Sequence, residues 1–253
     1  MQLSKRLLTA VGLITKGNIV ADVGCDHAYT SIYLCKEKIA PKVIAMDVNK
    51  GPLVGAKAHI EEAGLIDSIS LRLSNGLEKL LPNEVDTVLL CGMGGLLMIK
   101  ILSDYPEVTK TIKEFVLQPQ SEVAQVRHFL HNQGYKITKE HMLKEDGKFY
   151  VMMRAVPVTQ VQKYEEEYHY LYGKLLIEEK NEVLKEFLQR EYRLKSEVWE
   201  TLKEQNTENA LARKKTLKEE FENIRKTMEK VVPAKKMDLL DLNIKAVELG
   251  YNY

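Results

Sequence analysis

The stretch V-A-D-V-G-C-D-H-A-Y-T-S-I-Y-L, residues 20–34, decides which fold the first part of the chain can adopt. An apolar run ends at Asp22, the chain turns at Gly24, and a helical pattern begins a few residues later. A strand followed by a glycine turn and a helix places backbone N–H groups and a helix N-terminus at the carboxyl edge of a sheet. Such an edge suits an anionic or zwitterionic ligand, so the stretch predicts a cofactor-binding turn.

Strand-like and helix-like segments alternate along the first 157 residues, which is typical of right-handed βαβ units in a parallel sheet. Two further strand-like runs meet at Glu145-Asp146-Gly147, where D-G is a hairpin signal. Five parallel strands and a hairpin predict an α/β protein with a Rossmann-like class I methyltransferase sheet. A dinucleotide dehydrogenase would have no such hairpin. The expected strands are 19–24, 42–48, 68–73, 86–91 and 114–119, and the expected helices are 30–37, 52–63, 96–102 and 122–133.

The composition is that of a globular protein long enough for one full α/β domain and a smaller one. The chain has 253 residues, 45% hydrophobic and 29% charged, and no run approaches the ~20 apolar residues of a membrane span. Because the composition shifts after Pro157, we expect a catalytic, cofactor-binding domain over 1–157 and a helical domain over 158–253. The N-terminus is expected to form an amphipathic helix with one apolar face, made of Leu3, Leu7, Val11 and Ile14.

Cysteine and charge content bear on location and partners. The three cysteines have no C-x-x-C spacing, which favours reduced thiols and a cytoplasmic protein over disulfides or zinc. The net charge is +1, so composition alone does not support nucleic-acid binding. A basic patch would have to be created by folding.

The helical domain is predicted from residues 160–231, which are rich in Glu, Lys, Leu and Tyr. A break near 206–209, with Thr207 or Asn209 as the helix N-cap, favours two antiparallel helices in a coiled coil over one continuous solvated helix. A tail follows from Met237. The apolar seam of the second helix has heptad spacing and consists of Leu217, Phe221, Ile224, Met228 and Val231.

The choice of cofactor follows from the residues after Gly24. A pyrophosphate needs the close backbone approach of G-x-G-x-x-G, whereas Asp26 would repel it and could hold the ammonium or sulfonium of S-adenosylmethionine. Asp47 ends the second strand, where a carboxylate can accept hydrogen bonds from both ribose hydroxyls. We therefore predict S-adenosylmethionine, with S-adenosylhomocysteine as product, and no metal. The predicted cofactor-binding residues are Asp22, Gly24, Cys25, His27, Asp47, Val48, Asn75, Gly76, Gly92 and Met93.

Turns after the later strands extend the predicted site. Asn75-Gly76 stands where the adenine of the cofactor would be held, although a plain N-G turn has the same sequence. The glycines of Cys91-Gly92-Met93-Gly94-Gly95 either let the backbone approach a ligand or serve tight strand–helix packing. The fifth strand ends in Leu117–Gln120, which brings two amides to the same edge. The other histidines, His59 among them, share no ligand spacing, and we assign them no role.

Together these motifs resemble one family, the bacterial tRNA (adenine-22-N1)-methyltransferases, the TrmK family. The resemblance implies a Rossmann-like domain and a helical C-terminal domain that use S-adenosylmethionine to methylate N1 of a D-loop adenosine in tRNA. The chain departs from the family pattern at Cys25, Thr30-Ser31 and Gln120, where Ser, Leu-Pro and Asn are expected. The shared motifs span essentially the whole chain and are L-S-K-R-L (3–7), D-V-G-C-D-H-A-Y (22–29), C-G-M-G-G (91–95), L-Q-P-Q (117–120) and the coiled-coil region.

The resemblance implies an enzyme that acts on position 22 of tRNA. The N1 lone pair can attack the sulfonium methyl without prior removal of a proton, so the enzyme positions N1 and stabilises the charge that passes to the base. We expect Asp26 to accept from the exocyclic amine or to stabilise the cationic product, and Tyr29 to stack on the base. The candidate substrate-binding residues are Gly94, Gln118, Pro119 and Gln120.

Partners and alternatives follow from the same pattern. The expected partner is tRNA, with no membrane, no obligate protein partner, and a monomer or weak dimer. Basic residues on one face of the helical domain are expected to guide the tRNA, with dimerisation as the alternative role. The scaffold could also methylate another RNA or a protein, or bind S-adenosylmethionine without catalysis. Loss of cofactor binding is disfavoured, because the chain keeps Asp22, Gly24, Asp47 and the glycine-rich residues 92–95.

Overall fold

A computed structural model describes residues 3–232 of the chain. The chain divides into two compact units, Met1–Lys163 and Tyr164–Tyr253. The first unit contains the sheet, and the described part of the second unit is helical. The predicted tail from Met237 lies outside the described residues.

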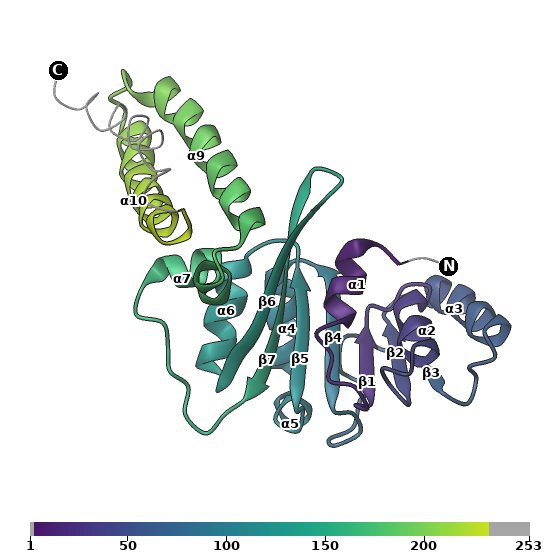
Figure 1. Ribbon diagram of the computed structural model, residues 1–253. Helices are drawn as coiled ribbons and strands as arrows, with labels where there is room; N and C mark the ends of the chain where they lie inside the picture. Colours follow the sequence, from purple (N-terminus) through teal and green to yellow (C-terminus); the bar gives the residue numbers. More distant parts are fainter. Residues whose placement is uncertain (1–2, 233–253) are drawn as a thin grey trace. The chain divides into compact units, whose positions relative to one another are not determined.

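The first unit is built on a seven-stranded sheet with the order β3-β2-β1-β4-β5-β7-β6 (Figure 1). β1 to β5 are parallel, and β7 runs antiparallel to both β5 and β6. The predicted fold is therefore confirmed. The strands are β1 Val20–Val23, β2 Val43–Asp47, β3 Ile69–Leu73, β4 Thr87–Met93, β5 Glu114–Pro119, β6 Tyr135–Glu145 and β7 Lys148–Pro157.

Helices cover both faces of this sheet (Figure 1). α1 to α3 contact one another in sequence, and α4 contacts both α5 and α6. In Figure 1, α1 lies in front of the sheet and α4 behind it. The helices are α1 Lys5–Val11, α2 Tyr29–Lys36, α3 Lys50–Glu62, α4 Gly95–Asp104, α5 Pro106–Thr109 and α6 Val123–Asn132.

Three of the parallel strands are buried from end to end. Every residue of β1, β2 and β5 is buried, as expected for parallel strands covered on both faces. β6, at the sheet edge, instead alternates buried and exposed positions along most of its length. Its turn into β7 uses Asp146 and Gly147, both with positive φ (49° and 75°), which is the geometry of a tight hairpin.

The predicted N-terminal helix is shorter than its apolar spacing indicates. α1 begins after Ser4, whose side chain accepts from the N–H of Leu7, and it ends before Gly12. Leu3 and Ile14 therefore lie outside the helix, although both are buried. The chain leaves α1 in a turn, after which Thr15 N–H donates to Glu114 at the amino end of β5.

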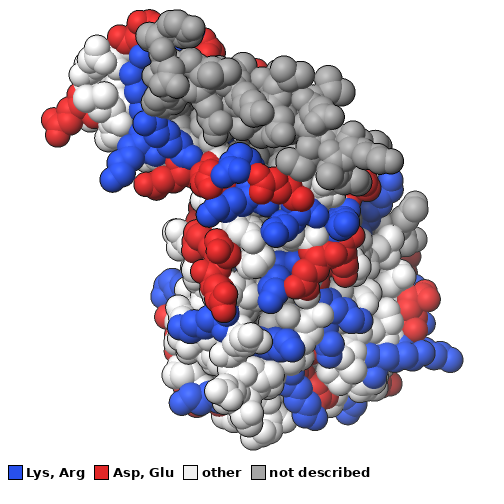
Figure 2. Space-filling view, turned by 60° about the vertical axis from the view of Figure 1, so that its left-hand side comes forward, with Lys and Arg blue, Asp and Glu red and all other residues white. Residues whose placement is uncertain are grey.

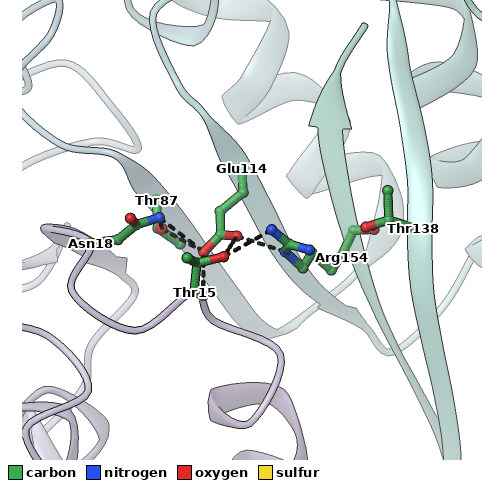
Figure 3. A network of polar contacts seen from close by, with 6 residues as sticks. All are labelled: Thr15, Asn18, Thr87, Glu114, Thr138 and Arg154. Atoms are coloured by element: carbon green, nitrogen blue, oxygen red, sulfur yellow. Dashed lines mark hydrogen bonds and ion pairs between the residues drawn. The ribbon is translucent and has the colours of Figure 1, made fainter.

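A buried carboxylate fixes this turn to the amino ends of the strands (Figure 3). Glu114 is 1% exposed and accepts from the backbone N–H and the hydroxyl of Thr15, at 2.8 and 2.7 Å. Thr87 and Arg154 also donate to it, at 2.8 and 2.6 Å. Burial raises the pKa of Glu114, but the hydrogen bonds from Thr15, Arg154 and Thr87 outweigh burial and leave that pKa below its ordinary value.

The second unit contains α7 Glu167–Tyr172, α8 Lys174–Glu178, α9 Glu182–Leu202 and α10 Glu208–Val231. α9 ends before α10 begins, so the alternative of one continuous helix is wrong. The Thr207 side chain caps α10 by accepting from Ala210 N–H at 3.3 Å, as one of the two predicted N-caps. Four of the predicted seam residues are buried against α9 and its neighbours, namely Leu217, Ile224, Met228 and Val231.

Polar contacts also join the two long helices. Lys195 of α9 lies 2.8 Å from Glu220 of α10, and Arg213 binds the same carboxylate at 2.7 Å. The Phe221 ring meets Tyr192 and Trp199 edge-on, with centroids 5.4 and 6.4 Å apart. No helix among residues 3–232 is long and apolar enough to cross a membrane.

Candidate functional site

The candidate site lies at the carboxyl ends of β1 to β5. The strand order reverses at β1, because the chain goes to β2 on one side and to β4 on the other. In open α/β sheets, this reversal leaves a crevice in which ligands bind. All predicted site residues follow the ends of these strands or belong to their last positions.

The turn after β1 has three residues in left-handed conformation. Gly24, Asp26 and Ala28 have φ values of 76°, 52° and 59°. The N–H groups of Gly24 and Cys25 both donate to the carbonyl of Met46, at 2.8 and 2.9 Å, which ties the turn to β2. The turn replaces a glycine-rich loop by placing non-glycine residues in conformations that glycine normally takes.

Asp22 is a buried acid beneath this turn. It is 5% exposed, and its Oδ2 accepts from the Ser31 hydroxyl at 2.6 Å. Burial raises the pKa of Asp22 to about 6, against the lowering effect of Ser31. An ionised carboxylate in such surroundings gains most from a cationic ligand group. Burial, followed by the charge of Asp22, also raises the pKa of Cys25, which is a neutral thiol.

Asp47 connects the turn to the end of β2. Its Oδ2 accepts from Asp26 N–H at 3.2 Å and its Oδ1 from Asn49 N–H at 2.9 Å. Each carboxylate oxygen can accept a second hydrogen bond, so both remain able to bind ribose hydroxyls. The neighbouring Val48 is 60% exposed, as an apolar surface beside this carboxylate.

The turn after β3 lies next to β2 at the carboxyl ends of the strands, which we call the rim. Ser74 N–H donates to the carbonyl of Asp47 at 2.9 Å, which links this turn to β2. Asn75 is exposed, and Gly76 is buried with φ 59°. A Cβ on Gly76 would lie 3.0 Å from Ile101, so this glycine serves packing as well as the turn.

The glycines after β4 have different roles. Gly92 has φ 77° and donates its N–H to Gln118 Oε1 at 3.1 Å. A Cβ on Gly95 would lie 2.5 Å from the carbonyl oxygen of Ser121, so Gly95 is required for helix packing. The Met93 methyl covers Gly24, where a Cβ would lie 2.1 Å from it. The packing alternative therefore holds for Gly95, and ligand approach at Gly92 stays a prediction.

Of the two amides predicted at the end of β5, only one is exposed. Gln118 is fully buried, whereas Gln120 is exposed and Pro119 is buried between them. Gln118 Oε1 accepts from both Gly92 N–H and Arg6 Nη1, the latter at 2.9 Å. Gly94 is half-buried, and a Cβ there would lie 3.1 Å from Ser121 Oγ.

Arg6 is a site residue that the sequence reasoning missed. It lies on α1, 112 positions from the glutamine it contacts. The motif L-S-K-R-L contains it, but no local pattern indicates that α1 packs against β5 and β7.

His27 and Tyr29 point into a cluster with two residues of α3. The Tyr29 ring stacks on His59 with centroids 4.7 Å apart, and its Oη lies 3.4 Å from His59 Nε2. His27 Nδ1 lies against Gly55, where a Cβ would be only 2.7 Å away, and its carbonyl lies 3.3 Å from His59 Nδ1. The expectation that His59 has no role therefore overlooked a contact. The signal was the i, i+4 spacing of Gly55 and His59 on one face of α3.

The rim is open on the side of Asp26. Its carboxylate is 73% exposed and lies 3.6 Å from His27 Nε2. His27 Nδ1 is buried without a hydrogen-bond partner. One exposed acid, an imidazole and a phenol ring therefore border the same turn, above the buried acid Asp22.

Charge on the surface is mixed. Figure 2 shows Lys and Arg side chains interspersed with Asp and Glu over the face drawn. This agrees with the near-neutral composition and gives no single basic surface on that face. Among residues 3–232, no three His, Cys, Asp or Glu side chains gather as metal ligands would.

Comparisons with known proteins point to one family. The model of the tRNA (adenine(22)-N(1))-methyltransferase family, TrmK, matches residues 20–226. The curated tRNA (adenine(22)-N(1))-methyltransferase of Bacillus subtilis is 36% identical over 155 residues, a match that covers 61% of this chain. That match spans 65% of the relative's length, which is less than two thirds.

Solved structures match over more of the chain. The crystal structure of the B. subtilis m1A22 tRNA methyltransferase TrmK has a TM-score of 0.82 at 30% identity and covers 90% of this chain and 99% of that chain. The M. capricolum TrmK structure, solved with the cofactor product S-adenosyl-homocysteine, has a TM-score of 0.80 at 27% identity. It covers 91% of this chain and 100% of that chain.

Proposed function

The chain belongs to the tRNA (adenine(22)-N(1))-methyltransferase family, and from this premise we propose that it transfers a methyl group from S-adenosylmethionine to N1 of adenosine 22 of tRNA. The observation that carries the proposal is the arrangement of acids and glycines at the switch point. Asp22 is buried beneath the β1 turn, Gly24 has positive φ in that turn, and Asp47 accepts a hydrogen bond from the turn at Asp26 N–H.

The residues of this crevice fit S-adenosylmethionine. When bound, this cofactor supplies an electrophilic methyl group on a sulfonium. Asp22 and the β1 turn would hold the methionine end, because a buried carboxylate is stabilised by an ammonium. Asp47 would accept from the ribose hydroxyls, with Val48 beside the nucleoside and Asn75-Gly76 at the adenine. Gly92 and Met93 would border the opposite side of the site.

Other residues of the chain would handle the substrate base. Asp26 is exposed on the rim, where its carboxylate can accept from the exocyclic amine or stabilise the cationic product. One face of the Tyr29 ring is already stacked on His59, so a base would stack on its other face. His27 would complete the pocket between them. Gly94, Pro119 and Gln120 would contact the substrate, and buried Gln118 would act through Gly92 and Arg6.

N1 lies on the Watson–Crick edge of adenine, so the nucleoside must leave any pair or stack before it enters this pocket. Its lone pair needs no base to remove a proton. The task of these residues is therefore to position N1 and to stabilise the positive charge that the base acquires.

Location and assembly belong to the same proposal. We place the protein in the cytoplasm, where tRNA and reduced thiols occur together, and as a monomer or weak dimer. Light scattering with and without tRNA tests the assembly. The second unit is assigned to tRNA guidance rather than to dimerisation, and a stable dimer formed through α9 and α10 would reverse that assignment.

The direct test is methylation of tRNA. We would incubate the protein with labelled S-adenosylmethionine and unmodified tRNA transcript, then digest the tRNA to nucleosides. 1-Methyladenosine is expected with the natural tRNA sequence and absent when guanosine replaces the adenosine at tRNA position 22. Label in another nucleoside, or only in protein, would assign the same scaffold to another substrate.

Two variants test the assigned roles. Asp47→Ala should raise the dissociation constant for S-adenosylhomocysteine. A dissociation constant that calorimetry finds unchanged would remove the ribose assignment.

Asp26→Ala should lower turnover with tRNA while the protein still binds the cofactor product. Wild-type turnover in this variant would remove Asp26 from catalysis.

A further inference from the structure

Arg6 has an unusual electrostatic position. Its guanidinium lies over the Tyr150 ring, 5.6 Å from the centroid, and donates one hydrogen bond, to the neutral Gln118. No ion pair joins Arg6 to an Asp or Glu within the described part of the chain, residues 3–232. Glu145, the acid that contacts α1, instead accepts from the backbone N–H of Lys5 at 2.7 Å. Arg6 therefore forms no ion pair with the described residues and keeps most of its five donors available.

This charge lies at the rim of the candidate site. Arg6 Nη1 would be 3.6 Å from a Cβ on Gly92, and Gln120 Nε2 would be 3.7 Å from the same point. Gly92 and Arg6 share one acceptor, the Oε1 of Gln118. The effect of Arg6 also reaches Cys91, whose pKa is raised by burial and by Asp22 while Arg6 acts in the opposite direction. Arg6 therefore lies beside Gly92, at the same edge of the sheet as the other glycines after β4.

The positive charge of Arg6 favours a phosphate over the methylated base as its ligand. A methylated N1 leaves the adenine positively charged, so a guanidinium near the base edge would oppose the reaction. A guanidinium that stacks on an aromatic ring and presents its remaining N–H groups is instead suited to a phosphate, which it can bind through two parallel hydrogen bonds. A nucleotide extruded into the pocket carries a phosphate on each side of its ribose.

We propose that Arg6 is the anchor for a backbone phosphate that flanks the methylated adenosine, and that Gln118 and Tyr150 hold its guanidinium for this contact. The proposal rests on the proposed function, since it takes tRNA as the substrate. In this arrangement the same Gln118 oxygen that orients Gly92 also orients the phosphate anchor. Binding of the phosphate by Arg6 would thereby be coupled, through Gln118, to the position of Gly92 beside the base.

Salt dependence gives the first test. We would measure tRNA binding to wild type, Arg6→Gln and Arg6→Lys over a range of KCl concentrations, with Lys42→Gln as the matched control. Lys42 is exposed and directly precedes β2, so it lies at the amino ends of the strands, away from the candidate site. Arg6→Gln should weaken tRNA binding by about tenfold and reduce the slope of log K against log[KCl] by about 1. Arg6→Lys should keep the slope but bind more weakly, because a point charge lacks the bidentate geometry.

A modified tRNA identifies the phosphate. Transcripts ligated with a neutral methylphosphonate on the 5′ or the 3′ side of adenosine 22 should each be compared with the unmodified tRNA. One of the two should weaken binding to the wild type by about tenfold and leave binding to Arg6→Gln unchanged, since the two changes remove the same contact. Additive losses at both positions would overturn the proposal.

The cofactor separates this proposal from its competitors. Arg6→Gln should bind S-adenosylhomocysteine with wild-type affinity. A loss of cofactor binding would mean that Arg6 only holds the Gly92 loop, and an unchanged salt slope would mean that it meets no phosphate. Both results overturn the proposal while wild-type methylation still succeeds. A wild type that forms no 1-methyladenosine would instead contradict the proposed function.

Discussion

The chemistry of the β1 turn depends on one buried acid. Asp22 is enclosed below Gly24, and its only recorded side-chain donor is Ser31, within residues 3–232. A carboxylate held in this way is costly to ionise unless a cation lies nearby. The position is therefore suited to a ligand with an ammonium group and unsuited to a pyrophosphate. Asp22 gives a physical reason for a methyl-donor cofactor at a turn that lacks the usual glycines.

The pKa of Asp22 predicts how cofactor binding depends on pH. That pKa is about 6 in the folded protein, above its ordinary value of 3.8, because of burial. A raised pKa means that ionised Asp22 costs stability at neutral pH, and that this cost disappears as the pH falls from about 6 toward 3.8. Protonation removes the partner of the ammonium group, so acid should weaken cofactor binding over the same range.

We expect the dissociation constant for S-adenosylhomocysteine to rise about tenfold between pH 7 and pH 5, because about a tenth of a group is ionised one unit below its pKa. Calorimetry at both pH values measures this change. Asp22→Asn should bind more weakly at pH 7 and show little further loss at pH 5. A variant that kept the wild-type pH profile would show that another group titrates.

At the scale of elements, α3 positions the β1 turn. Gly55 leaves the space that the His27 ring occupies, and His59, one turn further on, stacks on Tyr29. Two residues that belong to no recognised motif in the helix sequence therefore limit where the His27 and Tyr29 rings lie. The helix is a support for the site as well as part of the core.

Gly55→Ala should separate stability from activity. Alanine favours the helix by about 0.5–1 kcal/mol, but its Cβ would be 2.7 Å from His27 Nδ1 and would displace that ring. We expect unchanged or higher thermal stability and a methylation rate lower by about tenfold, because a displaced residue of the pocket misplaces the groups that react. Gly51→Ala is the matched control, because nothing lies within 4 Å of its Cβ position and it belongs to the same helix. Equal activity in the two variants would contradict the supporting role of α3.

The hydrogen bonds of Glu114 hold the segment that follows α1, which they contact at Thr15 (Figure 3). Because the folded-state pKa of Glu114 is below its ordinary value of 4.5, the network contributes stability at neutral pH that is lost as the pH falls through the folded-state value. Glu114→Gln should cost about 3 kcal/mol at pH 7, the order found when one partner of a buried pair is removed. Urea unfolding of both proteins at pH 7 and pH 4 measures this cost. The difference between them should shrink at pH 4, and a constant difference would contradict the linkage.

At the scale of the whole molecule, the chain consists of two compact units for which we propose different roles. The first contains every residue assigned to the cofactor, and the second contains two long helices joined by apolar and charged contacts. The predicted cofactor site is formed by strand ends that all belong to the first unit. We therefore expect cofactor binding to persist without the second unit.

Truncation after Lys163 tests this division. The shortened protein should bind S-adenosylhomocysteine with unchanged affinity and should bind tRNA at least about tenfold more weakly, because phosphate contacts of the helical unit are lost. Calorimetry and filter binding measure the two affinities. Equal tRNA affinity in both proteins would assign the helices to another role, and failure of the truncated protein to bind cofactor would show that the units depend on each other.

The sequence by itself predicted a parallel sheet with a hairpin, the break between the two long helices and the family, all of which the structure or the comparisons confirm. It left two candidates for the N-cap of the last helix, and the structure selects Thr207. These features depend on local patterns: buried strands have continuous apolar runs, and the rim residues follow strand ends directly. The assignment of individual residues to cofactor and base stays a prediction.

Only the tertiary structure decided which distant residues meet. Arg6 contacts Gln118 across 112 positions, and Thr15 contacts Glu114 across 99. The sequence does not show that Gln118 is buried, that Gly55 makes room for His27, or that His59 faces Tyr29. These contacts depend on how helices pack on the sheet, and packing is a property of side chains brought together by the whole fold.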